Sequence, residues 1–471
     1  MNFGIISTMN STIILLALTA VTTTDNNFWQ KGQAEITGKP ANAIVIEANE
    51  KAGPIFRAWG TTFNERDYAA LMMISEKDRK EALDKAFGPK SELKFTRGRL
   101  TMNANDYSYD WYCCSPDGDF ENKRFNIEED KANSFVYAHW ALERVPEMTF
   151  FLSPWSPPAW MKINQHYNGR VEEFDPNEMQ FADGRGKPFP RRLAAKSHFI
   201  MEDKYLKSYA DQFCKFITLS GKEGIKINRV MYQNEAYSYT PYPGCAWTSK
   251  DAVIFNRDYL APALKKTHPE VKLWMGSINT NRKKCVEEMM DELSPLMEGF
   301  GFQWEALDIA QEMCEKYQKP FICSEAECGN GRMDWGQGEH TFWLICKNLR
   351  YGAIEWYNWN YILEGMGTSR WKWNQNALIN VDLKTKKIRY TPEYYAVRHY
   401  SQFIQPGAQR LGGFVAQDWT DGVIYRNPDG SIVVVAGNFH GQEERRISIH
   451  LPDNRYLNLV LPPKSFNTVV L

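Results

Sequence analysis

The sequence lacks several features that would assign the protein to a specialised class. Its 9 cysteines include no CxxC pair, so no spacing typical of a zinc site is present, and their odd number leaves at least one thiol free. The 56 basic and 57 acidic residues nearly cancel, which leaves a net charge of −1. Such a balance gives no electrostatic reason to expect a nucleic acid or an anionic membrane as a partner.

Long hydrophobic runs are also scarce. The run Ile13–Val21 is about nine residues long, whereas a transmembrane helix needs ~20 residues. We therefore predict no membrane span, and we interpret residues 1–24 as a signal peptide cleaved near Ala20 or slightly later. The segment before Ile13 has no Lys or Arg, which is unusual for a signal peptide. The resulting expectation is a secreted or periplasmic protein.

Aromatic residues, in contrast, are abundant. They make up 14% of the chain, with 16 Trp and 23 Tyr. Cores favour Leu, Ile and Val, so a surplus of Trp indicates flat apolar surfaces on which a ligand such as a sugar ring can stack. The alternative interpretation is that these large rings fill the core of a large domain.

Short β-rich runs alternate with amphipathic helical stretches between about residues 55 and 400, and Asp203–Ser220 is the clearest helix. Eight strands, each followed by a helix, predict an α/β fold, the (β/α)₈ TIM barrel. An open doubly wound sheet would also alternate, but no GxGxxG turn follows the first run. The eight runs are Phe56–Gly60, Leu93–Leu100, Thr149–Pro154, Ile227–Gln233, Lys272–Ser277, Gly299–Trp304, Pro320–Ser324 and Ala353–Trp359.

The pattern changes after about residue 400. Short strand-like runs such as Ile432–Ala436 are separated by turns such as Asn427–Gly430, without helical periodicity. This texture predicts a small antiparallel β-sandwich over residues 401–471 beside a catalytic barrel at 56–400. Residues 25–55 are expected to add a strand to the sandwich, with Ala43–Ala48 as the candidate.

Polar residues gather at the ends of the predicted strands. The fourth run leads into Asn234 and Glu235, the seventh into Glu325, and the second contains Arg99. Because the active site of a TIM barrel lies at the C-terminal ends of its strands, these groups should converge. Two carboxylates with amides and aromatic rings are what glycoside hydrolysis requires. We expect Glu235 to be the general acid/base and Glu325 the nucleophile of a retaining β-glycosidase, with Arg99 keeping Glu325 ionised.

Several residues compete for these roles. Glu327 lies two positions after Glu325 and is an alternative nucleophile, while Glu305 and Glu355 near other strand ends could be structural ion-pair partners. Arg97 could share a face with Arg99 because one residue separates them. Trp155, in a proline-rich loop, could serve packing alone.

At these residues the chain resembles glycoside hydrolase family 30, which includes glucosylceramidases and microbial β-1,6-glucanases. The motifs RLTMNANDYS, SPWSPPAWMKIN, YQNEA, SEAE and YNWNYIL occur in the family's order over roughly residues 40–471. The resemblance assigns the catalytic pair to Glu235 and Glu325. It places six residues in substrate binding, namely Arg99, Asp106, Trp155, Asn234, Trp304 and Trp359.

The resemblance implies a barrel with a side β-sandwich built from both chain ends, and retaining hydrolysis of a β-linked oligosaccharide or glucan without metal or cofactor. Two departures concern the sugar site: Ala236 replaces a common proline, and Asn103–Asn105 replace smaller residues. Alternatives are a β-xylosidase or β-fucosidase of the family, a non-catalytic glycan-binding barrel, and a metal-dependent hydrolase. The last needs His at strand ends, where none of the 8 His falls. The long loop Asn164–Phe199 could favour either exo or endo cleavage.

Overall fold

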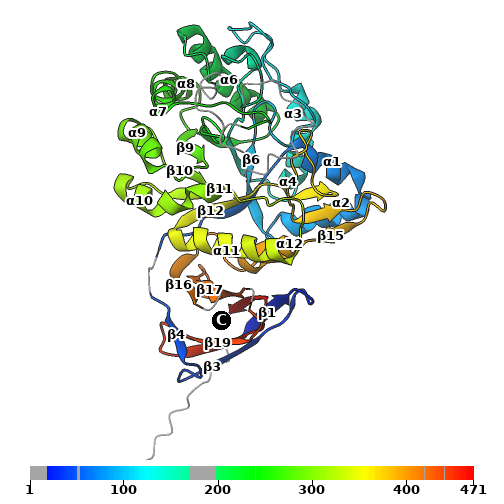
Figure 1. Cartoon of the computed structure of the whole chain (residues 1–471), viewed down its shortest axis with the longest axis vertical. Coiled ribbons are helices and arrows are strands. Elements are labelled where there is room, and N and C mark those ends of the chain that lie inside the picture. The colour runs from blue at the N-terminus through cyan, green and yellow to red at the C-terminus, as the bar shows by residue number, and fades with distance from the viewer. Residues whose placement is uncertain (1–17, 50–52, 170–197, 239, 418–419, 440) are drawn as a thin grey trace, which may run out of the picture.

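The protein consists of a closed barrel above a β-sandwich (Figure 1). The structure is a computed structural model and describes residues 18–49, 53–169, 198–238, 240–417, 420–439 and 441–471. Of the predicted loop Asn164–Phe199, residues 170–197 lie outside the described residues. Eight parallel strands close the barrel in chain order. They are β5 (Ala58–Thr62), β6 (Phe95–Leu100), β7 (Thr149–Leu152), β8 (Ile227–Met231), β9 (Lys272–Ile278), β10 (Phe300–Gln303), β11 (Phe321–Glu325) and β12 (Ala353–Asn358).

Each of the eight predicted runs overlaps one of these strands, so the predicted TIM barrel is confirmed. The bounds differ by a few residues. The seventh strand extends by one residue beyond the predicted end, so that Glu325 is the last residue of β11 rather than a loop residue. As a result, strand pairing fixes the backbone of Glu325 and thereby places its carboxylate at the barrel rim.

Helices alternate with these strands and surround the barrel. The predicted helix Asp203–Ser220 is confirmed as α6, and several helices begin at a side chain that caps a free N–H group, as Thr391 does for α12. The helices are α1 (Glu65–Met73), α2 (Glu76–Ala86), α3 (Glu128–Ala132), α4 (Ser134–Leu142), η1 (Ala159–Met161), α6 (Asp203–Lys222), α7 (Ser249–Ile254), η4 (Phe255–Leu260), α8 (Ala261–Thr267), α9 (Lys283–Leu293), η5 (Trp304–Ala306), α10 (Leu307–Tyr317), α11 (Trp335–Tyr351) and α12 (Pro392–Ser401). A small sheet of β13 (Ile362–Glu364), β14 (Ile379–Val381) and β15 (Ile388–Tyr390) precedes α12.

The interior of the barrel is apolar in its middle and charged at both ends. Six buried residues from five strands form the central layer: Phe151, Met231, Trp274, Ile322, Ile354 and Tyr357. On the C-terminal side of this layer lies Arg99, whose guanidinium carbon is 5.5 Å from the ring of Phe151. On the N-terminal side Arg229 and Glu355 form an ion pair. The layer separates two charged sites that share one barrel.

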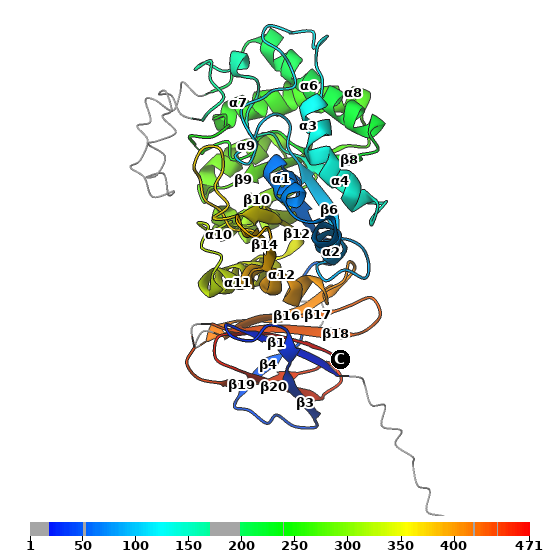
Figure 2. The same cartoon turned by 90° about the vertical axis from the view of Figure 1, so that its right-hand side faces the viewer.

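Both ends of the chain build the sandwich, whose two sheets lie one above the other in Figure 2. The predicted strand in Ala43–Ala48 is observed as β4, but it pairs with β19 in parallel, so the domain is not purely antiparallel. One sheet has the order β16 (Gln409–Gln417), β17 (Thr420–Arg426), β18 (Ile432–Asn438), β21 (Ser465–Val470), β1 (Thr19–Thr24) and β2 (Gln30–Lys31). The other has the order β3 (Gln33–Thr37), β20 (Tyr456–Leu461), β19 (Arg445–His450) and β4 (Ile44–Glu47).

Strand β1 overlaps the segment that the sequence predicts as a signal peptide. Residues 19–24, which the sequence assigned to a signal peptide, pair with β21 along their whole length and with β2. The run of Thr and Val explains this, because β-branched side chains suit a strand as well as they suit an apolar leader. Residues 1–17 lie outside the described residues. No helix in the described part of the chain is long and apolar enough to cross a membrane.

Helices α11 and α12 join the two domains. They lie between barrel and sandwich (Figure 1), and residues of both domains share one hydrophobic core. Within it Phe342 of α11 stacks on Phe466 of β21 at 4.6 Å, and Arg350 donates to both oxygens of Asp421 at 2.8 and 2.6 Å. The sandwich therefore supports the barrel from the side and leaves its C-terminal end to the loops.

Candidate active site

Arg99 is the centre of the polar site at the C-terminal end of the barrel. It lies in β6 with its side chain fully buried, and its guanidinium is paired with the carboxylate of Glu325 at the end of β11. The same guanidinium donates to Asn234 Oδ1 at 2.7 Å and to Ser153 Oγ at 3.2 Å. Three strand ends are thereby tied to one cation, and the predicted partnership of Arg99 with Glu325 is present.

Gln303, the last residue of β10, was missed by sequence reasoning although it also lies at a strand end. Its amide nitrogen donates to Asn234 Oδ1 at 2.8 Å, to Ser277 Oγ at 3.0 Å and to Glu325 Oε2 at 3.3 Å. Because Arg99 can only donate, the oxygen of the Asn234 amide must face it. The nitrogen of Asn234 therefore points away from Arg99.

Glu235 follows Asn234 and has an unusual backbone. Its φ is +51°, in the left-handed region that non-glycine residues rarely adopt, and its N–H donates to the Ser277 carbonyl at 2.9 Å. The Asn279 amide nitrogen lies 3.5 Å from Glu235 Oε1. The Glu305 N–H holds the Asn279 oxygen at 3.1 Å, which fixes the orientation of that amide. Asn279, just after β9, is a second residue that sequence reasoning missed.

The acids of the site have altered pKa values. Burial, followed by the neighbouring Glu325 carboxylate, raises the pKa of Glu235 to about 7. Burial also raises the pKa of Glu325, and the Arg99 guanidinium opposes that rise. Burial together with Glu325 and Glu235 raises the pKa of Asp106 well above its ordinary value. Three carboxyl groups thus lie close enough to raise one another's pKa values, and the pKa of Glu235 comes to lie near neutral pH.

Four buried polar atoms of the site residues have no hydrogen-bond partner among the described residues, two of them being Nε of Arg99 and Oε1 of Gln303. The other two are Oδ1 of Asp106, whose second oxygen accepts from Gln375 at 3.4 Å, and the indole nitrogen of Trp359. A buried donor or acceptor without a partner is costly, so such atoms indicate a ligand that completes them. An acceptor and a donor of this kind suit sugar hydroxyl groups.

The tryptophans differ from the expected open stacking platform. Trp155 and Trp359 are 2% and 0% exposed and stack on each other at 4.8 Å. The Arg99 guanidinium carbon lies 4.5 Å from the first ring and 5.3 Å from the second. Each ring therefore covers one face of the other, and neither ring is open to solvent. Trp304, directly after β10, is half-buried against the core.

Two of the three competing carboxylates are occupied elsewhere. Glu327 accepts from His340 of α11 at 2.5 Å, and Glu355 forms two bonds with Arg229 at 2.9 and 3.0 Å. The side chain of Glu305 is exposed. In the described part of the chain there is no group of three or more His, Cys, Asp or Glu that could hold a metal. We therefore keep Glu235 and Glu325 as the predicted catalytic pair.

A closed barrel with one glutamate after its fourth strand and another at the end of its seventh is typical of a class, the barrel glycoside hydrolases. The comparison with protein families names the group within this class. A model described as "Glycosyl hydrolase family 30 TIM-barrel domain" matches residues 56–178 and 196–404, and one described as "Glycosyl hydrolase family 30 beta sandwich domain" matches residues 407–469. The chain belongs to glycosyl hydrolase family 30, and it is a β-glycosidase; retaining chemistry is typical of that family.

Similar proteins agree with this assignment. The lysosomal acid glucosylceramidase of Mus musculus is 26% identical over 465 residues, which cover 93% of this chain and 84% of that protein. An endo-1,6-beta-D-glucanase of Trichoderma harzianum is 23% identical over 64% of this chain and 60% of its own length. Among solved structures, SrfJ from Salmonella typhimurium has a TM-score of 0.81 at 19% identity, covering 97% of this chain and 99% of that one.

Proposed function

We propose that the protein hydrolyses a β-linked glucoside by double displacement between Glu325 and Glu235. The observation that carries this proposal is the Arg99 guanidinium, which holds the Glu325 carboxylate and the oxygen of Asn234 together beside Glu235. A cation on one carboxylate and a pKa of about 7 on the other separate the two roles. The first acid is equipped to attack and the second to donate a proton.

In the first step a Glu325 oxygen bonds to the anomeric carbon while the bond from that carbon to the glycosidic oxygen breaks. Glu235 gives its proton to the departing oxygen. The glycosyl ester removes the charge of Glu325, so the pKa of Glu235 falls and its carboxylate can act as a base. Water then attacks the anomeric carbon, loses a proton to Glu235 and releases Glu325.

The remaining predicted residues hold the sugar in this proposal. The nitrogen of Asn234 donates to the 2-hydroxyl, where hydrogen bonds strengthen as positive charge develops on the ring. Asp106 Oδ1 accepts from another hydroxyl group and the Trp359 N–H donates to one; both atoms have no partner among the described residues. Trp155 supports Arg99 and Trp359 by stacking, and Trp304 contributes the exposed part of its ring.

Glucose is the proposed sugar because the names of the two relatives, a glucosylceramidase and a 1,6-beta-D-glucanase, both contain a glucosyl group. Aryl β-glucoside, β-xyloside and β-fucoside should be compared by kcat/KM. The xyloside lacks the hydroxymethyl group, so we expect it to be at least about tenfold slower. A faster xyloside or fucoside contradicts the choice of glucose. Product lengths from β-1,6- and β-1,3-glucans then distinguish exo from endo cleavage.

We also propose that the protein is exported. The apolar run Ile13–Val21 supports export. The run overlaps β1, which begins at Thr19, so cleavage after the run removes part of that strand. Mass measurement of the protein recovered outside the cell tests the proposal. We expect a chain shortened at its N-terminus; full-length protein confined to the cell contradicts export.

A further inference from the structure

A second hollow lies at the opposite, N-terminal end of the barrel, where the family's chemistry does not take place. Its volume is about 420 Å³, within the range of small-molecule sites. The walls come from the starts of β8 and β9 and from the segments before β5, β10 and β11. They comprise Arg57, Asn228, Arg229, Lys272, Trp274, Glu298, Gln318, Lys319 and Pro320.

The charges of this lining do not cancel. Four of its residues are basic and one, Glu298, is acidic. Glu298 lies 3.7 Å from Lys272, and Arg229 is neutralised by the buried Glu355. No described residue forms an ion pair with Arg57 or Lys319, so two positive charges remain at the hollow.

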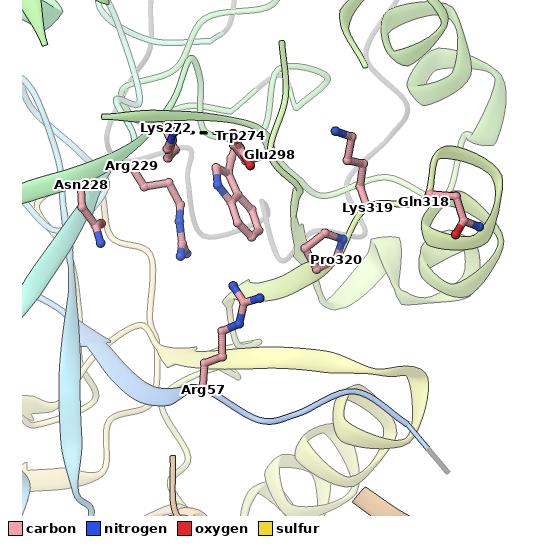
Figure 3. A pocket seen from close by; sticks show the side chains of 9 residues that line it. All are labelled: Arg57, Asn228, Arg229, Lys272, Trp274, Glu298, Gln318, Lys319 and Pro320. Atoms are coloured by element: carbon pink, nitrogen blue, oxygen red, sulfur yellow. Dashed lines mark ion pairs between the residues drawn. The ribbon is translucent and has the colours of Figure 1, made fainter. Parts of the chain in front are cut away.

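The geometry brings planar donors together. In Figure 3 the side chains of Arg57, from the segment before β5, and Arg229, from β8, point into the same space. Arg229 is held by its two bonds to Glu355 and by the indole of Trp274, whose ring centre is 4.1 Å from the guanidinium carbon. A guanidinium that is already fixed loses little conformational freedom when it binds an anion. Guanidinium groups also match the geometry of oxyanions better than ammonium groups do.

We propose that this hollow binds a phosphate-type oxyanion, either free phosphate or the phosphate of a small molecule. Arg57 and Lys319 supply the uncompensated charge, and Arg229 supplies a fixed donor edge. The space exceeds what one phosphate ion fills, which favours a phosphorylated small molecule. Because the apolar layer of the barrel separates this hollow from Glu325, its ligand is distinct from the glycoside that the enzyme cleaves.

The experiment is a calorimetric titration of the full-length protein with inorganic phosphate and, separately, with a sugar phosphate, at constant ionic strength set by chloride. Arg57→Ala and Lys319→Ala are each expected to weaken binding about tenfold, the effect of one charge-assisted hydrogen bond. Glu298→Gln removes the carboxylate of the lining and is expected to strengthen it. Lys284→Ala, which removes an exposed lysine of α9 outside the hollow, is the matched control.

Saturable binding that weakens in Arg57→Ala and Lys319→Ala, strengthens in Glu298→Gln and is unchanged in Lys284→Ala supports the proposal. Tighter binding of the sugar phosphate than of phosphate identifies the ligand as a phosphorylated molecule, and equal affinity identifies free phosphate. The proposal is overturned if neither phosphate nor the sugar phosphate gives saturable heat, or if all variants, including the control, weaken binding equally. Glycosidase activity should be unchanged in Arg57→Ala, so the result is independent of the proposed catalytic roles.

Discussion

Two ion pairs between arginine and glutamate lie inside the same barrel, one at each end of its apolar layer. At the N-terminal end Arg229 meets Glu355 through two parallel bonds, and the Tyr357 hydroxyl donates to the same carboxylate at 2.8 Å. At the C-terminal end Arg99 divides its donors between Glu325, Asn234 and Ser153.

The pKa values of the two glutamates show what this difference means. Burial raises the pKa of Glu355, but the bonds from Arg229 and Tyr357 outweigh burial and leave that pKa below its ordinary value. Burial raises the pKa of Glu325 as well, and Arg99 does not fully offset it. Glu355 is therefore fully held by its donors and is structural. The ionised form of Glu325 is less stabilised, which leaves that carboxylate more reactive toward a substrate.

The largest expected effect separates the two pairs by activity. Glu325→Gln should lower kcat/KM for an aryl β-glucoside by at least about 10⁴-fold, because the attacking oxygen is lost. Circular dichroism should show an intact fold. The matched control is Glu327→Gln, whose side chain faces His340, and its activity should remain close to that of the parent. Comparable losses in both variants would contradict the assignment of Glu325.

The second effect is on stability. Glu355→Gln removes one partner of a buried pair, so the free energy of unfolding should fall by about 3–5 kcal/mol. Urea denaturation measures it. Replacing both partners, as Arg229→Met with Glu355→Leu, should recover much of the loss, because no charge is then left buried alone. If the single and double variants are equally destabilised, the pair is not the cause.

The third effect is a pH dependence. Glu235 acts in its protonated form in the first step, and its pKa is about 7. Above that pH the acid form is lost, so kcat/KM for a poor leaving group should fall about tenfold per unit. A dinitrophenyl glucoside, whose leaving group needs no proton, should keep its kcat/KM over this range. A parallel fall for both substrates would assign the titration to another group.

The smallest effect concerns Asn279. Its N–H faces Glu235 Oε1 and favours the ionised carboxylate. Asn279→Ala should therefore raise the pKa of Glu235 and move the alkaline limb of the kcat/KM profile upward by about half a unit. Asn281→Ala, an exposed asparagine two positions further along, is the control and should leave the limb in place. A downward shift would show that Asn279 does not donate to Glu235.

The sequence was sufficient for the parts of the molecule that depend on local periodicity. Eight strand–helix units and the strand ends at Glu235 and Glu325 follow from patterns of a few residues. The β1 strand was not predicted, because the apolar run Ile13–Val21, which suits a leader, overlaps the β-branched threonines of residues 19–24, which suit a strand. Gln303 lay within a predicted strand, but its bond to Asn234 depends on which strand ends meet across the barrel.

The tryptophans show another limit. Abundant Trp indicated an exposed platform, whereas Trp155 and Trp359 cover each other. Whether a ring is open depends on loops from strands that are distant in the sequence, and composition does not contain that information. Likewise Glu325 and Glu327 could not be separated by spacing alone; His340, on the following helix, occupies the second carboxylate.

The most direct test of the account is to trap the covalent intermediate. A 2-deoxy-2-fluoro-β-glucoside with a dinitrophenyl leaving group should esterify the nucleophile. The fluorine slows both steps, but the dinitrophenyl leaving group restores the rate of the first, so the ester accumulates. Mass spectrometry of the digested protein then locates the sugar. We predict that the label is on Glu325. A label on Glu327 or on any other carboxylate would contradict the central claim.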